Sequence, residues 1–122
     1  MLEAYLFAVA VGVVAEVTAR VGRLWLYRRP IYPVINVLVM FGVVQGLLLA
    51  SLVSPLGVIP VFLAGWAVGY LYEMLNFGRL GWWHFPGDRF LVFRGKQACA
   101  LAVGALWGAV PIAVHFFDAL SP

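Results

Sequence analysis

Apolar residues run along this chain in four long stretches, and polar residues gather between them. The stretches cover about residues 4–20, 31–53, 58–76 and 97–117. Each is close to the roughly 20 residues that a helix needs to cross a hydrocarbon core of about 30 Å. Backbone groups in that core must hydrogen-bond within the protein, so each stretch is predicted to be a helix. The pattern predicts an all-α integral membrane bundle of four transmembrane helices, with residues 1–122 forming a single transmembrane domain.

The composition supports a protein that is covered by lipid. Hydrophobic residues make up 65% of the chain and charged residues only 11%, whereas soluble domains carry about 25% charged residues. These few charges cannot cover a water-exposed surface of this size. Much of the surface is therefore expected to face the bilayer.

The basic residues fall in two groups that flank the predicted spans. The first group lies between spans one and two, and the second between spans three and four: Arg20, Arg23, Arg28 and Arg29, then Arg79, Arg89, Arg94 and Lys96. Positive loops stay in the cytoplasm. The chain is therefore expected to be a multi-pass protein of the bacterial cytoplasmic (inner) membrane, with both termini outside. Anionic lipid headgroups explain the net charge of +3 better than a nucleic acid does.

The two halves of the chain carry a weak internal repeat. When the chain is compared with itself at an offset of 57 residues, four positions match the same or a similar residue. Ala8, Gly12, Glu16 and Trp25 correspond to Gly65, Gly69, Glu73 and Trp82. In the second and fourth spans, Gly42 and Gly46 are echoed by Gly104 and Gly108. The pattern is compatible with two helical hairpins related by an axis along the membrane normal. Coincidence is the alternative, because membrane helices favour small residues.

Glu16 and Glu73 are the candidate functional residues. Each follows small residues at a spacing of four, which places them on one helix face. Small residues let helices approach closely, so this face is expected to point into the bundle. The two carboxylates could bind a proton or a cation, with their charge tuned by the neighbouring arginines Arg20, Arg23 and Arg79. Structural ion pairs, such as Glu16 with Arg20 at i,i+4, are the alternative.

Three amide side chains lie near these carboxylates along the chain. Asn36 and Gln45 are the polar residues of the second span, and Asn76 follows Glu73. Hydrogen bonding between helices is one interpretation, and the lining of a polar pathway is the other.

The loop after the third span is aromatic. Trp82, Trp83 and Phe85 are expected to lie at headgroup depth as an interfacial belt, with a docking surface for a partner or a lipid as the alternative. Neither histidine has ligand partners at metal-site spacing, and Cys99 is expected to be a packing residue, so no metal or cofactor is predicted.

The second half resembles the bacterial family described as type-IV ABC-transporter membrane proteins. The resemblance covers about residues 65–112, and it consists of Gly69, Glu73, Trp82-Trp83, Phe90 or Phe93, Gly95, Cys99 and Trp107-Gly108. It implies a multi-spanning membrane protein with a role in transport. The segment Ala15-Glu16-Val17 is similar to the first span of small multidrug-resistance exporters, in which a glutamate exchanges protons for cationic drugs.

The leading functional hypothesis is a small membrane protein of a transport system, which moves a solute or cation or serves as the system's membrane subunit. A non-catalytic accessory subunit is the first alternative, because the chain has more Gly-x3-Gly faces than four helices need, which indicates a homo-oligomer or a larger complex. A lipid-modifying enzyme is the second. The chain carries no nucleophile motif, phosphate loop or dinucleotide fingerprint, which favours a non-enzymatic role.

Overall fold

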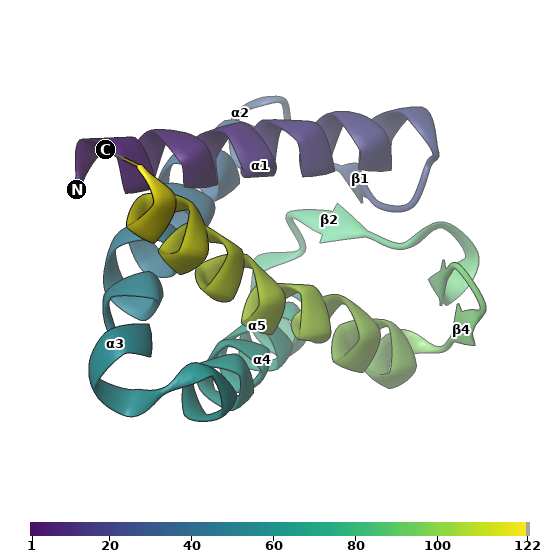
Figure 1. Cartoon of the computed structure of the whole chain (residues 1–122). Coiled ribbons are helices and arrows are strands. Elements are labelled where there is room, and N and C mark those ends of the chain that lie inside the picture. Colours follow the sequence, from purple (N-terminus) through teal and green to yellow (C-terminus); the bar gives the residue numbers. More distant parts are fainter. Residues whose placement is uncertain (122) are drawn as a thin grey trace.

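Four long helices form the molecule, which is described here over residues 1–121 by a computed structural model (Figure 1). They are α1 (Leu2–Val21), α2 (Ile31–Ile35) continued by the π-helix η1 (Asn36–Leu49), α4 (Val58–Leu75) continued by the π-helix η2 (Asn76–Leu80), and α5 (Lys96–Leu120). All four are long and apolar enough to cross a membrane. The prediction of an all-α, multi-pass membrane bundle is confirmed. Residue 122, the end of the predicted domain, lies outside the described residues.

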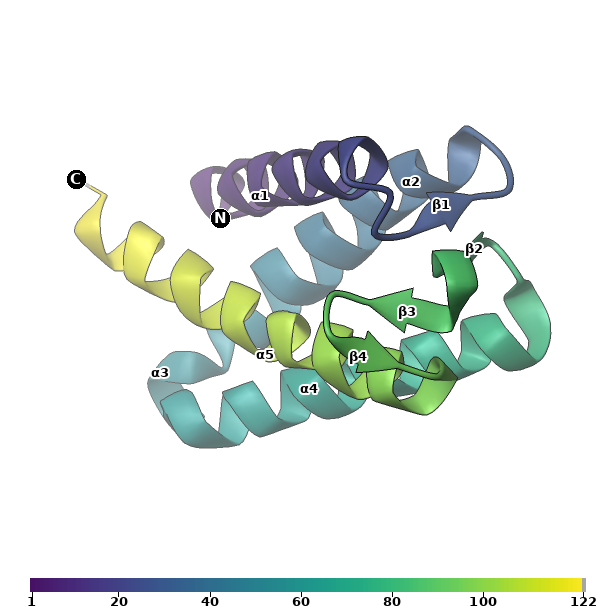
Figure 2. The same cartoon turned by 90° about the vertical axis from the view of Figure 1, so that its right-hand side faces the viewer.

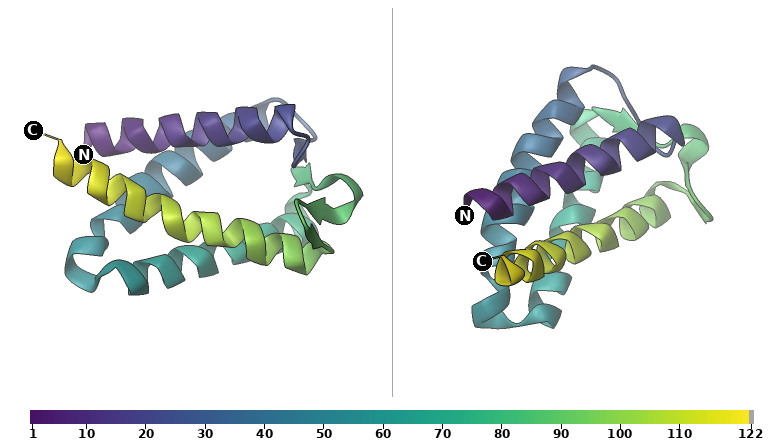
Figure 3. Two further views of the ribbon diagram at one scale, coloured as in Figure 1. Left: turned by 45° about the vertical axis from the view of Figure 1, so that its right-hand side comes forward. Right: turned by 45° about the horizontal axis from the view of Figure 1, so that its top comes forward.

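Short elements connect the helices. They are the strands β1 (Leu26–Tyr27), β2 (Trp83–His84), β3 (Arg89–Phe90) and β4 (Phe93–Arg94), the short helix α3 (Val53–Leu56) and the 3₁₀ turn η3 (Pro86–Asp88). Both termini and α3 lie at one end of the bundle, and the strands lie at the other (Figures 1 and 3). Both arginine-bearing loops therefore share one end, which we call the basic end.

Two helix boundaries differ from the hydropathy pattern. The second span is shorter than predicted, because η1 ends at Leu49 and α3 forms a separate turn before Gly57, whose φ is +93°. The third span is longer, because the π-helix η2 carries it to Leu80. Both π-helices begin at an asparagine, Asn36 or Asn76, and π-helical turns often occur at functional sites.

The helices pair as two hairpins, α1 with η1 and α4 with α5. Glycines make the close approach in the second hairpin possible. A Cβ atom added at Gly65 would lie 2.6 Å from the carbonyl oxygen of Trp107 and 2.8 Å from the Cα of Gly108. A Cβ atom at Gly108 would lie 2.5 Å from the carbonyl oxygen of Phe62. These neighbours are backbone atoms, so only glycine allows this helix separation.

All three Gly-x3-Gly pairs are used inside the chain. Gly42 and Gly46 contact α1, Gly65 and Gly69 contact α5, and Gly104 and Gly108 contact α4. The expectation that some of these glycines face a partner chain is wrong, because the two hairpins occupy all six. The glycine count therefore no longer favours an accessory subunit.

The strand pairing at the basic end repeats the sequence offset. Strands β1 and β2 are antiparallel, with Leu26 opposite His84 and Tyr27 opposite Trp83 (Figure 2). Moving each residue to its counterpart 57 positions away exchanges these two pairs. The ladder is thus two-fold symmetric, and its two strands are related by the same offset of 57 residues that relates Gly12 to Gly69. This pairing supports the internal repeat.

We expect Gly65→Ala to separate α4 from α5 and to lower stability by about 1–3 kcal/mol, because backbone atoms cannot move aside as a flexible side chain can. The matched control is Gly78→Ala, since no described atom lies within 4 Å of a Cβ at Gly78. The control should change stability by less than about 0.5 kcal/mol. Unfolding in detergent monitored by circular dichroism measures both, and equal stabilities for the two variants would contradict this packing.

Candidate functional site: two buried carboxylates and an interior cavity

Glu16 lies near the basic end of α1 and accepts hydrogen bonds from three neutral side chains. Trp25 Nε1 donates to Oε2 at 3.0 Å, and Tyr27 Oη and Asn36 Nδ2 each donate to Oε1 at 2.6 Å. Only 9% of the Glu16 surface is exposed. The donors come from the start of η1 and from the segment that contains β1, so the carboxylate joins three parts of the first hairpin.

A backbone reversal after α1 brings two of these donors over Glu16. Arg23 takes a left-handed φ of 53°, and the Leu24 amide donates to the carbonyl of Ala19 at 2.8 Å. The chain then runs back as β1. Trp25 and Tyr27, two positions apart in extended chain, project to the same side, and both reach the carboxylate.

Glu73 is the corresponding carboxylate of α4 and is 4% exposed. Trp83 Nε1 donates to its Oε2 at 2.8 Å. Each carboxylate therefore accepts from an indole in the loop that follows its own helix. The offset of 57 matched Trp25 with Trp82, but it is Trp83 that reaches Glu73. Trp82 stacks instead on Tyr32, with ring centroids 4.5 Å apart.

Asn76 holds the second loop in place. Its Nδ2 donates to the carbonyl of Trp83 at 2.8 Å, and its Oδ1 accepts from the amides of Trp82 and Trp83 at 2.8 and 3.2 Å. The side chain is fully buried. The pathway interpretation is wrong for Asn76, because both of its polar atoms are engaged by the loop backbone.

The arginines do not contact the carboxylates. Arg20, Arg23 and Arg79 are exposed, and the hydrogen bonds that Glu16 and Glu73 accept from residues 1–121 all come from neutral donors. Glu16 and Glu73 therefore form no ion pair with these arginines, so the alternative of structural ion pairs is wrong, whereas the tuning of the carboxylates by Arg20, Arg23 and Arg79 stays a prediction. Long basic side chains at a span end extend toward water or headgroups, whereas the carboxylates lie beneath the loops.

A cavity of about 190 Å³ lies between the two hairpins. All four spans and both loops contribute to its wall. Its polar lining consists of Tyr27, Asn36, Gln45, Tyr72 and Glu73, and its aromatic lining of Trp25, Phe41, Trp83 and Trp107. Glu16 borders a separate groove, on the other side of Trp25 and Tyr27.

Several polar atoms in the cavity wall have no partner among the described residues. Gln45 is fully buried, and neither of its amide atoms is hydrogen-bonded within residues 1–121. The same holds for Asn36 Oδ1 and Tyr72 Oη. Buried polar groups are nearly always paired. Here four unpaired atoms belong to three side chains, and all three side chains line the same cavity. They indicate a place for a polar ligand or for water.

No family model, curated protein or solved structure matches the chain. The two family resemblances therefore stay predictions.

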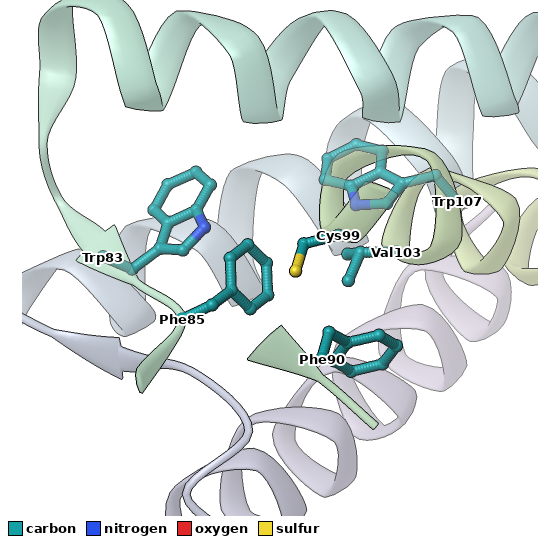
Figure 4. Close-up of a cluster of buried hydrophobic side chains, with 6 residues drawn as sticks. All are labelled: Trp83, Phe85, Phe90, Cys99, Val103 and Trp107. Atoms are coloured by element: carbon teal, nitrogen blue, oxygen red, sulfur yellow. The ribbon is translucent and has the colours of Figure 1, made fainter. Parts of the chain in front are cut away.

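The aromatic loop forms part of the core. Trp83 and Phe85 are 6% and 3% exposed, and Figure 4 shows them with Phe90, facing Cys99, Val103 and Trp107 of α5. The expected interfacial belt is wrong for these two residues, because the loop folds back over the end of α5. Cys99 is a buried packing residue. Within residues 1–121, no three His, Cys, Asp or Glu side chains come together as a metal site requires.

The structure also brings residues to the candidate site that the sequence pattern did not single out. Trp25, Tyr27, Tyr72 and Trp107 all line the cavity. A usable signal for two of them was the alternation of Trp25 with Tyr27, because alternate residues of an extended segment share one face.

We expect Asn76→Ala to release the loop and to lower stability by about 2–4 kcal/mol, because two amides and one carbonyl of Trp82 and Trp83 lose their buried partner. Hydrogen exchange measured on peptides covering residues 81–85 should accelerate. Gln97→Ala serves as the control, because the Gln97 side chain is exposed and makes one long contact, from its Nε2 to Tyr70 Oη at 3.4 Å. An Asn76 variant as stable and as protected as this control would contradict the role of Asn76.

The Tyr27 hydroxyl should stay protonated in alkaline solution. Burial raises its pKa well above the ordinary 10.0, and the charge of Glu16 raises it further. The folded state thus holds this proton more tightly than the unfolded chain. The stability that Tyr27 contributes is complete below about pH 10 and is lost as the pH rises beyond it.

Phenolate absorbance tests this expectation. Between about pH 9 and pH 11, folded Tyr27→Phe should give the same absorbance change as the wild type, since Tyr27 does not ionise there. In denaturant the variant should give four fifths of the wild-type change, because the chain has five tyrosines. A smaller change in the folded variant would show that Tyr27 ionises normally.

Proposed function

We propose that this protein belongs to a transport system of the bacterial cytoplasmic membrane and binds a small organic cation in its interior cavity. The observation that carries the proposal is the cavity itself, in which one carboxylate, several aromatic rings and an unpartnered amide surround the same space. The arginine-bearing loops favour an orientation with the basic end in the cytoplasm and both termini outside.

The unpartnered amide supports a ligand that is partly polar. A buried polar group without a hydrogen bond costs about 1–3 kcal/mol. Gln45 leaves both a donor and an acceptor open, and Asn36 leaves an acceptor. A ligand with a hydroxyl or amine group would satisfy them. The volume of about 190 Å³ equals that of roughly six liquid water molecules, which suits a compact molecule.

The aromatic walls and Glu73 support a positive charge on that ligand. Tryptophan faces attract cations, most strongly where water is excluded. Trp25, Trp83 and Trp107 line the cavity together with Glu73. The carboxylate of Glu73 accepts from Trp83, and a carboxylate has about four acceptor positions. Acceptor positions on Glu73 therefore remain for a bound ammonium group.

In this proposal, Glu16 holds the side chains that separate the cavity from the basic end. Trp25 and Tyr27 border both the cavity and the groove beyond it, and both donate to Glu16. Hydrogen bonds to an ionised carboxylate are about twice as strong as neutral ones. Glu16→Gln would therefore weaken both contacts, loosen these two side chains and open the cavity toward the basic end.

Tetramethylammonium is a suitable probe, with neopentane as an uncharged control of the same shape. In reconstituted vesicles we expect Glu73→Gln to weaken tetramethylammonium binding by about tenfold or more and to reduce its uptake in parallel, since a charged contact is lost. Glu3→Gln, at the exposed start of α1, should leave both unchanged. Tryptophan fluorescence and uptake of the labelled cation measure the two quantities.

Two results would sink the proposal. One is equal affinity of the wild type for tetramethylammonium and neopentane. The other is a folded Glu73→Gln protein that binds and transports the cation as well as the Glu3→Gln control. Gln45→Leu gives an independent measurement, because it fills the same region without altering a charge, and it should weaken the binding of a hydroxylated cation more than that of tetramethylammonium.

A further inference from the structure

A second hollow lies at the basic end, on the other side of Trp25 and Tyr27 from the interior cavity. It is a groove of about 550 Å³ between the last turn of α1, strand β1 and the first turn of α2. Three arginines border it, namely Arg20 of α1 and Arg28 and Arg29 of the turn after β1. The cation site proposed above does not include this groove.

The three guanidinium groups are free to bind a ligand. All three arginines are exposed, and in the part of the chain that the structure describes, the one arginine side chain that donates a hydrogen bond is Arg89, elsewhere in the loops. Arginine presents planar pairs of donors that match the oxygens of a phosphate. Three such groups from two segments around one groove therefore favour a phosphate-bearing anion.

The rest of the groove is apolar and continues onto the lipid-facing surface. Val17, Leu26 and Pro33 form part of its wall. Along the same helices, Val13 of α1 and Val34 of α2 are 47% and 49% exposed, as expected of side chains that face lipid in a membrane span. The groove thus joins a cationic mouth to an apolar surface, which is the polarity of a phospholipid headgroup and the start of its acyl chain.

Glu16 also borders the groove and must be compatible with an anion. It is buried, and its two oxygens already accept from Trp25, Tyr27 and Asn36. The lining contains three arginines and one glutamate, a formal net charge of +2. Attraction therefore outweighs repulsion for a ligand that carries one negative charge.

We propose that this groove is a binding site for the headgroup of an anionic phospholipid, with phosphate held by Arg20, Arg28 and Arg29 and the acyl chain lying along α1 and α2. The bilayer is the source of the ligand, because the groove lies at the end of two membrane spans. A zwitterionic lipid fits less well, because its cationic choline or ethanolamine group would approach the arginines.

The full-length protein in nanodiscs of phosphatidylcholine, doped with labelled phosphatidylglycerol, tests the site. We expect saturable binding that is weakened about fivefold by Arg20→Gln and roughly twentyfold by the double change Arg28→Gln and Arg29→Gln. The matched control is Arg79→Gln with Arg94→Gln, which removes two exposed arginines of the other loop and should leave the affinity unchanged. Replacement of Arg28 and Arg29 by lysine keeps the charge and should give an intermediate affinity.

Three outcomes would overturn the proposal. Equal weakening by the two double variants would mean general attraction to the basic end. Equal affinity for phosphatidylglycerol and phosphatidylcholine would mean that the anionic charge is not recognised. Inorganic phosphate that stabilises detergent-purified protein as strongly as phosphatidylglycerol, with the same dependence on Arg28 and Arg29, would assign the groove to a free phosphate instead of a lipid.

Discussion

Two carboxylates beneath the surface of a membrane-spanning bundle need hydrogen-bond donors that the bilayer cannot supply. In this protein the donors are indole, phenol and amide groups. Glu16 is held by Trp25, Tyr27 and Asn36, and Glu73 by Trp83. Three of these donors lie in the loops, so the loops must fold back over the bundle to reach the carboxylates. The reversal after α1, the Asn76 contacts and the β1–β2 ladder are the means by which the chain does so.

The same constraint explains where the molecule is tight and where it is open. Glycines bring the two helices of each hairpin into close contact, as at Gly65 and Gly108 in the second hairpin. The polar side chains Gln45 and Glu73 instead lie where the two hairpins face each other, and the cavity forms there. Helix contact at glycine and a hollow between the hairpins are therefore two consequences of one arrangement.

Hydropathy was sufficient to predict the spans, because a lipid environment leaves a helix as the simplest structure for an apolar run. The spacing of Gly12 with Glu16 also placed that carboxylate inside, where the structure buries it. The donors could not be predicted in this way. They depend on a left-handed residue at Arg23, on the Asn76 contacts with the loop backbone, and on π-helical turns that hydrophobic periodicity does not mark. The choice of Trp83 over Trp82 is one example, since an offset alone favours the wrong indole.

Glu16 has a different position from Glu73, although the offset of 57 residues pairs the two in the sequence. Glu73 borders the interior cavity, whereas Glu16 borders the outer groove, and the wall between the two hollows consists of Trp25 and Tyr27. Both of these residues donate hydrogen bonds to Glu16. A change that weakens or strengthens those hydrogen bonds therefore changes how firmly the wall between the hollows is held. An anion held by Arg20, Arg28 and Arg29 would lie in the groove that Trp25, Tyr27 and Glu16 also border. The two carboxylates therefore have different surroundings: Glu73 faces the interior cavity, and Glu16 holds the two side chains that line both hollows.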